Sequence, residues 1–158
     1  MKINIDNLEE TYKICKSSGK FKEKFIDIEL IKSMKDISER GLKFIKDKSK
    51  DIIKESEDWT FVFRDYYESL RSLIECYLLF EGMEADNHQC KNAYICFKHS
   101  ELELDWNFLE TIRLKRNAIN YRGQLLKYDD WKSLKLKFEL HINALKKEIE
   151  KRLEKIGK

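Results

Sequence analysis

Apolar residues recur every three or four positions along most of this chain, and this spacing constrains the fold more than any other feature. Such spacing gives an α-helix one side that packs against a core and another that faces water. The sequence has no proline and only 5 glycines among 158 residues, so the residues that interrupt helices are scarce. No segment has the alternation of apolar and polar residues that is typical of strands. The chain is therefore predicted to be all-α.

The same spacing divides the chain into a bundle of five or six helices. The most apolar segment, 57–82, is expected to form a central helix that ends at Gly82, because glycine readily adopts the left-handed conformation that follows many helices. The other predicted helices are a short one over 5–17 capped by Asp6, a long one over 27–54 that can bend near Gly41, one over 87–98 capped by Asn87, one from Asp105 to Gly123, and a last long helix capped by Asp129 or Asp130.

Length and charge limit the classes of protein that this sequence can represent. A chain of 158 residues is long enough to bury a core, so residues 1–158 are interpreted as a single helical domain. Lysine and arginine number 32 against 29 acidic residues, and a net charge of +3 does not by itself indicate a nucleic-acid partner. Any basic site must therefore be local. Because no run of 18 apolar residues occurs, no membrane partner is expected.

The cysteines suggest a compartment. Cys15, Cys76, Cys90 and Cys96 contain no CxxC pair, and the first six residues lack the apolar stretch of a secretory signal. We therefore expect a cytoplasmic protein whose thiols are reduced.

Four potential zinc ligands lie within twelve residues, at His88, Cys90, Cys96 and His99. His88 and Cys90 fall near one end of the predicted helix 87–98, whereas Cys96 and His99 fall near the other, so the four side chains cannot converge on one ion. No metal site and no cofactor are expected. The third histidine, His141, lies at the edge of the apolar stripe of the last helix and is interpreted as structural.

Two glutamates interrupt the apolar central helix. Glu68 and Glu75 are seven residues apart and so lie nearly in line on one face. A carboxylate beside apolar surface needs a partner. That partner can be Arg71 of the same helix, as an ordinary ion pair, or an arginine from residues 113–116 across the bundle, as part of a site.

Ile112–Gly123 is the segment with the densest polar chemistry, with four basic side chains, two amides and one phenol. Arginine forks match phosphate oxygens, and tyrosine can stack on a base. The segment is either a helical face that binds RNA or phosphate, flanked by Lys115 and Arg122, or an ordinary solvated face, and the pattern alone favours the second. At about 100° per residue, five of the side chains share an arc of about 140°: Arg113, Arg116, Asn117, Asn120 and Tyr121.

The chain resembles HEPN domains, the all-α modules named for nucleotide-binding members in higher eukaryotes and prokaryotes. Residues 66–82, followed by Asn87 and His88, are similar to the long helix of the family and the glycine-containing loop after it. Residues 113–123 are similar to its signature helix, in which an arginine, often followed by a polar residue, precedes a histidine by four to six positions. The resemblance covers 58–150 and predicts a HEPN-like bundle, whereas 1–57 matches only in being helical.

This resemblance implies a metal-independent endoribonuclease, often the toxin of a toxin–antitoxin pair, in which the 2′-hydroxyl of RNA attacks the adjacent phosphate. It also implies a homodimer whose two signature helices line one cleft. Carried onto this sequence, Arg116 would contact the scissile phosphate, Asn117 and Asn120 would orient it, and Glu75 would fix Arg116. The position of the histidine is occupied by Tyr121. A tyrosine hydroxyl keeps its proton at neutral pH, so weak or absent cleavage is expected.

Three functions follow as hypotheses. The first is an RNA-interacting protein of the toxin or defence type. The second is a non-catalytic module that binds a nucleotide or a partner protein, such as an antitoxin or a nucleotidyltransferase. The third is a purely structural helical dimer.

Overall fold

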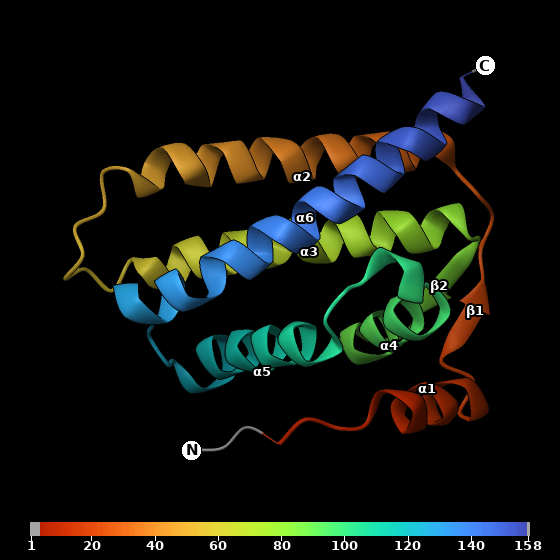
Figure 1. Ribbon diagram of the computed structural model, residues 1–158, viewed down its shortest axis with the longest axis horizontal. Coiled ribbons are helices and arrows are strands. Elements are labelled where there is room, and N and C mark those ends of the chain that lie inside the picture. Colours follow the sequence, from red (N-terminus) through yellow and green to blue (C-terminus); the bar gives the residue numbers. More distant parts are fainter. Residues whose placement is uncertain (1–3, 158) are drawn as a thin grey trace.

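A computed structural model describes residues 4–157 of the chain. The described part is a helical bundle with a minor sheet of two strands, which confirms the all-α prediction (Figure 1). In chain order the elements are α1 (Leu8–Ser17), β1 (Phe21–Glu23), α2 (Ile28–Ser49), α3 (Trp59–Phe80), β2 (Met83–Ala85), α4 (His88–Lys98), the 3₁₀ helix η1 (Ser100–Leu102), α5 (Trp106–Arg122) and α6 (Tyr128–Ile156).

Helix α3 lies at the centre of the bundle, as its apolar sequence predicts. Helices α2 and α6 pack on one side of it, and α4 and α5 pack on the other (Figure 1). Of its 22 residues, 14 are buried, so little of its circumference is left for water. The chain leaves the helix at Gly82, whose φ of 67° is left-handed, and this confirms the predicted end. A side chain there would also crowd the carbonyl oxygen of Lys24, only 3.2 Å from an added Cβ.

Helices α2 and α3 are joined by a reciprocal pair of serine hydrogen bonds. The hydroxyl of Ser38 donates to the carbonyl of Ser69 at 3.2 Å, and the hydroxyl of Ser69 donates to the carbonyl of Ser38 at 3.1 Å. Gly41 lies beside this contact, where an added Cβ would meet Ser69 at 3.8 Å. The two serines therefore hold the helices together, a Cβ at Gly41 would make only ordinary contact there, and α2 continues through Gly41 as one helix.

The two short strands correct the expectation that the chain contains none. β1 and β2 pair antiparallel, with Phe21 opposite Ala85, Lys22 opposite Glu84 and Glu23 opposite Met83. They lie in the connections that precede α2 and follow α3, which are far apart in the sequence. Three residues are too few to produce a recognisable alternation, and the pairing depends on the helices that bring the two connections together.

Several helix starts agree with the sequence. The side chain of Asn87 accepts a hydrogen bond from the backbone N–H of Cys90 at 2.8 Å, and Asp105 accepts one from Phe108 at 3.1 Å. Both predicted caps are confirmed. At the other end of α5, Gly123 has a φ of 63° and ends the helix as predicted.

Two predicted caps are wrong by a few positions. Helix α1 is capped by Asn7 rather than Asp6, through a 3.1 Å bond from the backbone N–H of Glu10. The N-cap residue of α6 is Lys127. Asp130 lies within the first turn of α6, and its side chain accepts a hydrogen bond from the backbone N–H of Lys127 at 3.1 Å. Neighbouring polar residues offer equivalent caps, and the backbone path selects between them.

The prediction of reduced thiols is wrong for one pair of cysteines. Cys15 of α1 and Cys90 of α4 form a disulfide, whereas Cys76 and Cys96 are buried free thiols. Burial raises the pKa of each of these two thiols to about 12, so they remain protonated. Within residues 4–157, no helix combines the length and the hydropathy that a bilayer-spanning segment requires.

The disulfide should contribute strongly to stability because it closes a long loop. It joins residues 75 positions apart, and chain-entropy arguments give about 4 kcal/mol for a loop of that size. We expect the variant with Cys15→Ser and Cys90→Ser to lose about 2–4 kcal/mol of unfolding free energy in urea titrations. A reductant should destabilise the wild type but not this variant; equal stability of the two proteins would contradict the expectation.

Candidate functional site

Arg116 of α5 points toward the central helix rather than directly into solvent. Its Nη2 atom lies 3.7 Å from Oε1 of Glu68 on α3, and its guanidinium carbon lies 5.8 Å from the centroid of the Tyr67 ring. The arginine is thus held by an ion pair and by a cation–π contact. Burial raises the pKa of the Tyr67 hydroxyl to about 12, although Arg116 opposes this shift, so the ring stays neutral.

A polar strip on α3 supplies the carboxylates of this region. Nε of Arg71 donates to Glu68 at 2.9 Å, and Nη1 of Arg71 reaches Glu75 at 3.4 Å. Lys91 of α4 pairs with Glu75 at 3.5 Å. The expected pairing of Glu75 with Arg116 is therefore corrected: Glu68 contacts Arg116, and Glu75 contacts Arg71 and Lys91. Both predicted kinds of partner are present, since Glu68 contacts Arg71 of its own helix and Arg116 of α5.

His88 belongs to the same cluster. Together with Arg71, Lys91 and the Tyr67 ring, it lines a small cavity between α3, α4 and α5 of about 10 Å³, the space of one water molecule. The Nδ1 atom of His88 is buried without a hydrogen-bond partner, and so is Nε of Arg116. Within residues 4–157 these are the only two buried side-chain nitrogen or oxygen atoms in that condition.

The charges around His88 keep its ring neutral. Burial first, and then the cations Arg71, Lys91 and Arg116, lower the pKa of His88 to about 4, whereas Glu68 acts in the opposite direction. At neutral pH the imidazole is therefore uncharged. The three cations exceed the two carboxylates of the α3 strip, Glu68 and Glu75, by one charge. The surroundings of the imidazole are therefore positive by one charge.

Arg113 faces a different partner. Its Nε and Nη2 atoms both donate to Glu110 at 2.9 Å, and Glu110 also accepts from Gln89 at 3.0 Å and from Asn92 at 3.1 Å. The Glu110 side chain is only 2% exposed. Two of the donor atoms of Arg113 are thus committed to a buried carboxylate, and its predicted contact with phosphate would compete with this pairing.

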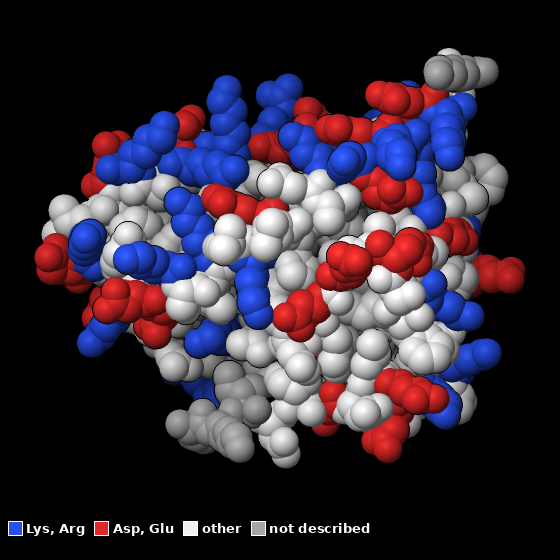
Figure 2. Space-filling view, viewed as in Figure 1, with Lys and Arg blue, Asp and Glu red and all other residues white. Residues whose placement is uncertain are grey.

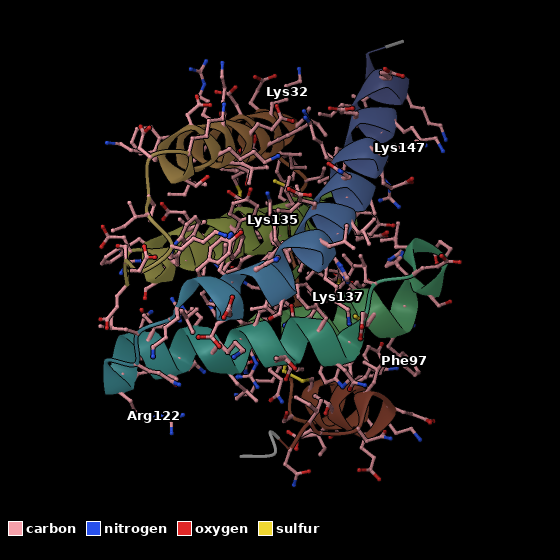
Figure 3. The ribbon with its side chains drawn as sticks, turned by 60° about the vertical axis from the view of Figure 1, so that its left-hand side comes forward. Lys32, Phe97, Arg122, Lys135, Lys137 and Lys147 are labelled. Atoms are coloured by element: carbon pink, nitrogen blue, oxygen red, sulfur yellow. A yellow bond between two sulfur atoms is a disulfide. The ribbon has the colours of Figure 1, made fainter. Side chains whose placement is uncertain are left out.

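The last turn of α5 is open to solvent. Asn120, Tyr121 and Arg122 are exposed, and the Tyr121 side chain is 78% exposed. Figure 3 shows Arg122 extending away from the bundle at the end of α5. Asn117 and Lys115 are half-buried. The predicted single basic face is therefore divided into an inner part, with Arg113 and Arg116 held by carboxylates, and an outer part without such support.

Other charged surfaces are mixed in sign. Figure 2 shows lysine and arginine interleaved with acidic residues along α2 and the C-terminal part of α6. Arg40 pairs with Asp36 at 2.7 Å, and Lys146 lies 3.9 Å from Glu39. The face drawn there is an ordinary solvated surface, with no large field of one sign.

The remaining histidines have other partners. Nε2 of His141 accepts from the backbone N–H of Asp105 at 2.9 Å, and this bond anchors α6 to the start of α5. Nδ1 of His141 lies 2.7 Å from the carbonyl of Lys137 within α6. His99 contacts Glu81 and Glu101, each at 3.0 Å. Among the described residues, no three His, Cys, Asp or Glu side chains are grouped to hold a metal ion.

Sequence reasoning missed His88, Lys91 and Glu110 as parts of the site. His88 and Lys91 are three residues apart on α4 and so share a face, which is a visible signal. Which helix that face meets depends on the tertiary packing. No protein-family model, curated protein or solved structure matches this chain.

The buried carboxylate of Glu110 provides a test of this geometry. Glu110→Ala would leave Arg113, Gln89 and Asn92 without their shared acceptor, and we expect a loss of about 3 kcal/mol of unfolding free energy. The matched control is Glu9→Ala, which removes an exposed ion pair with Lys13 and should cost less than about 1 kcal/mol. Urea titrations measure both, and equal losses would contradict the assignment.

Proposed function

We propose that this protein is a HEPN-like, RNA-interacting helical protein of the toxin or defence type, in which Arg116 contacts a backbone phosphate. One observation carries the proposal: Glu68 holds the guanidinium of Arg116 at 3.7 Å, and the Arg116 side chain is still 20% exposed. An arginine that is braced on one side and keeps part of its side chain accessible is suited to a phosphate oxygen. The resemblance of residues 58–150 to HEPN domains supports the same class of ligand.

Neighbouring side chains strengthen the site as a phosphate binder. Arg71 and Lys91 add two cations within the same cluster, and Asn120 and Arg122 on the outer turn are accessible to a longer strand. Because RNA affinity comes mainly from such contacts with the backbone, binding should weaken as the salt concentration rises. The proposed interaction uses side chains alone and needs no metal ion.

A second copy of the chain is part of the proposal. Ile37 and Phe44 of α2 are 68% and 61% exposed, and they line one groove with Glu68 and Arg71. Large exposed apolar side chains beside a polar site are typical of protein interfaces. A homodimer that covers these side chains would place two Arg116 clusters near one another.

A phenol at the position of the family's histidine favours binding over cleavage. An imidazole exchanges a proton at neutral pH far more readily than a phenol does, and Tyr121, on the last turn of α5, is 78% exposed. A non-catalytic module that binds a nucleotide, an antitoxin or a nucleotidyltransferase through the same arginines is therefore the second candidate function.

The proposal is tested by RNA binding of Arg116→Ala. We expect labelled single-stranded RNA to bind the wild type at low salt, with about tenfold weaker binding by the variant and a salt slope that is smaller by about one. Fluorescence anisotropy measures both, with the oligomeric state determined by light scattering. The matched control is Lys147→Ala, an exposed cation on α6 (Figure 3), which should change the affinity less than about twofold. Absence of RNA binding, or equal effects of the two substitutions, would overturn the proposal.

Cleavage is tested separately with Tyr121→His. A histidine five residues after Arg116 restores the spacing of the family signature, and it can exchange a proton at neutral pH. We expect cleavage of labelled RNA in EDTA to rise by about tenfold or more, and the added Arg116→Ala substitution to abolish it. Tyr121→Phe serves as the control and should leave the rate unchanged. An unchanged rate for Tyr121→His would exclude this position from the reacting centre.

A further inference from the structure

The orphaned nitrogen atoms lie on two helices but in one cluster. Nδ1 of His88 comes from the first turn of α4, and Nε of Arg116 comes from the middle of α5. Buried polar atoms are rarely left without partners in proteins. His88 lines the small cavity together with Arg71 and Lys91, so an acceptor atom can bind there; Arg116 is close enough to act on the charge of His88 but does not line the cavity.

The size of the cavity limits what can enter it. A volume of about 10 Å³ admits one oxygen atom and not a whole phosphate group. The side chain of Arg71 at the cavity is 30% exposed, whereas that of Lys91 is 13% exposed. An oxyanion can thus rest against Arg71 with a single oxygen directed inward, between cations that would neutralise its charge.

We propose that this cluster is a proton-coupled oxyanion site, in which His88 takes up one proton when the anion binds. Under the proposed function above, the natural ligand is an RNA phosphodiester; this identity rests on that function, whereas the proton coupling does not. The protonated imidazole would donate from Nδ1 to the anion, beside the cations Arg71 and Lys91 that line the same cavity.

The direction of the coupling follows from the groups that face His88. The cations are Arg71 from α3, Lys91 from α4 and Arg116 from α5, and the α3 carboxylates Glu68 and Glu75 lie among them. Together with burial, the cations hold the pKa of His88 near 4 in the unliganded protein. A bound anion offsets their repulsion of the imidazolium and accepts its proton in a hydrogen bond. The pKa of His88 therefore rises on binding, and by linkage the affinity for the anion rises as the pH falls.

The test is a titration of the folded protein with sodium sulfate at constant ionic strength, at about pH 5 and about pH 8. Sulfate is the probe because its charge does not change between these values. If binding returns the pKa of His88 from about 4 to 6.5, sulfate should bind about thirtyfold more tightly at the lower pH. Calorimetry in buffers of different ionisation enthalpy measures the proton taken up.

Two variants isolate the histidine. His88→Gln should lose this ratio and keep only the pH dependence that does not involve His88, which both proteins share. His99→Gln, at the other end of α4, is the matched control and should behave as the wild type. A measurement without any substitution is the NMR titration of His88, whose pKa should rise when sulfate is added.

The outcomes separate this inference from the proposed function. Equal pH ratios for wild type and His88→Gln, or a pKa of His88 that sulfate does not change, would overturn the proton coupling even if RNA binds. Coupled binding of sulfate without any binding of a short RNA would support the oxyanion site and overturn the RNA-interacting function. If neither sulfate nor RNA binds, the two nitrogen atoms bind only water. That outcome would overturn both the oxyanion site and the RNA-interacting function.

Discussion

The structure depends on the need to pair the charges that interrupt an otherwise apolar central helix. Helix α3 is covered by neighbours on both sides, yet Glu68, Arg71 and Glu75 lie along one strip of it. Charged groups taken partly out of water are costly unless other charges or donors meet them. Arg116 of α5 and Lys91 of α4 meet this strip, so the packing of three helices and the formation of a cationic cluster have one physical cause.

Helix α5 illustrates how one sequence segment can serve two purposes. Its inner turns place Arg113 and Arg116 against Glu110 and Glu68, where they fix the helix to its neighbours. Its outer turn presents Asn120 and Tyr121 to solvent. Guanidinium groups that are already ion-paired lose less conformational entropy when a ligand arrives, whereas exposed side chains without such partners lose more. Under the proposed function, Arg116 is therefore better prepared for a phosphate than the outer turn is, whereas Arg113 is already committed to Glu110.

The sequence predicts local features well, and the fold bears this out. Helical spacing identified the central helix, and local chemistry identified the caps Asn87 and Asp105 and the end of α5 at Gly123. Each of these depends on a few neighbouring residues. The cap of α1 was displaced by one position because two polar residues compete there.

Features that depend on contacts between distant segments could not be read in the same way. Glu68 and Glu75 occupy equivalent positions on one face, and only the placement of α5 makes Glu68 the partner of Arg116. His88 lies far from the basic segment in sequence, and its role in the cluster requires α4 to pack beside α5. The pairing of Cys15 with Cys90 likewise depends on the contact between α1 and α4.

The disulfide between Cys15 and Cys90 joins helix α1 covalently to the part of α4 that contains His88. Cys90 follows His88 by two residues, so the covalent bond holds the first turn of α4 directly. A protease that cut the connection between α1 and α2 would leave α1 bound to the rest of the molecule through sulfur. The two fragments would stay covalently joined until thiol–disulfide exchange broke the bond between Cys15 and Cys90. That exchange would remove the covalent tie two residues after His88.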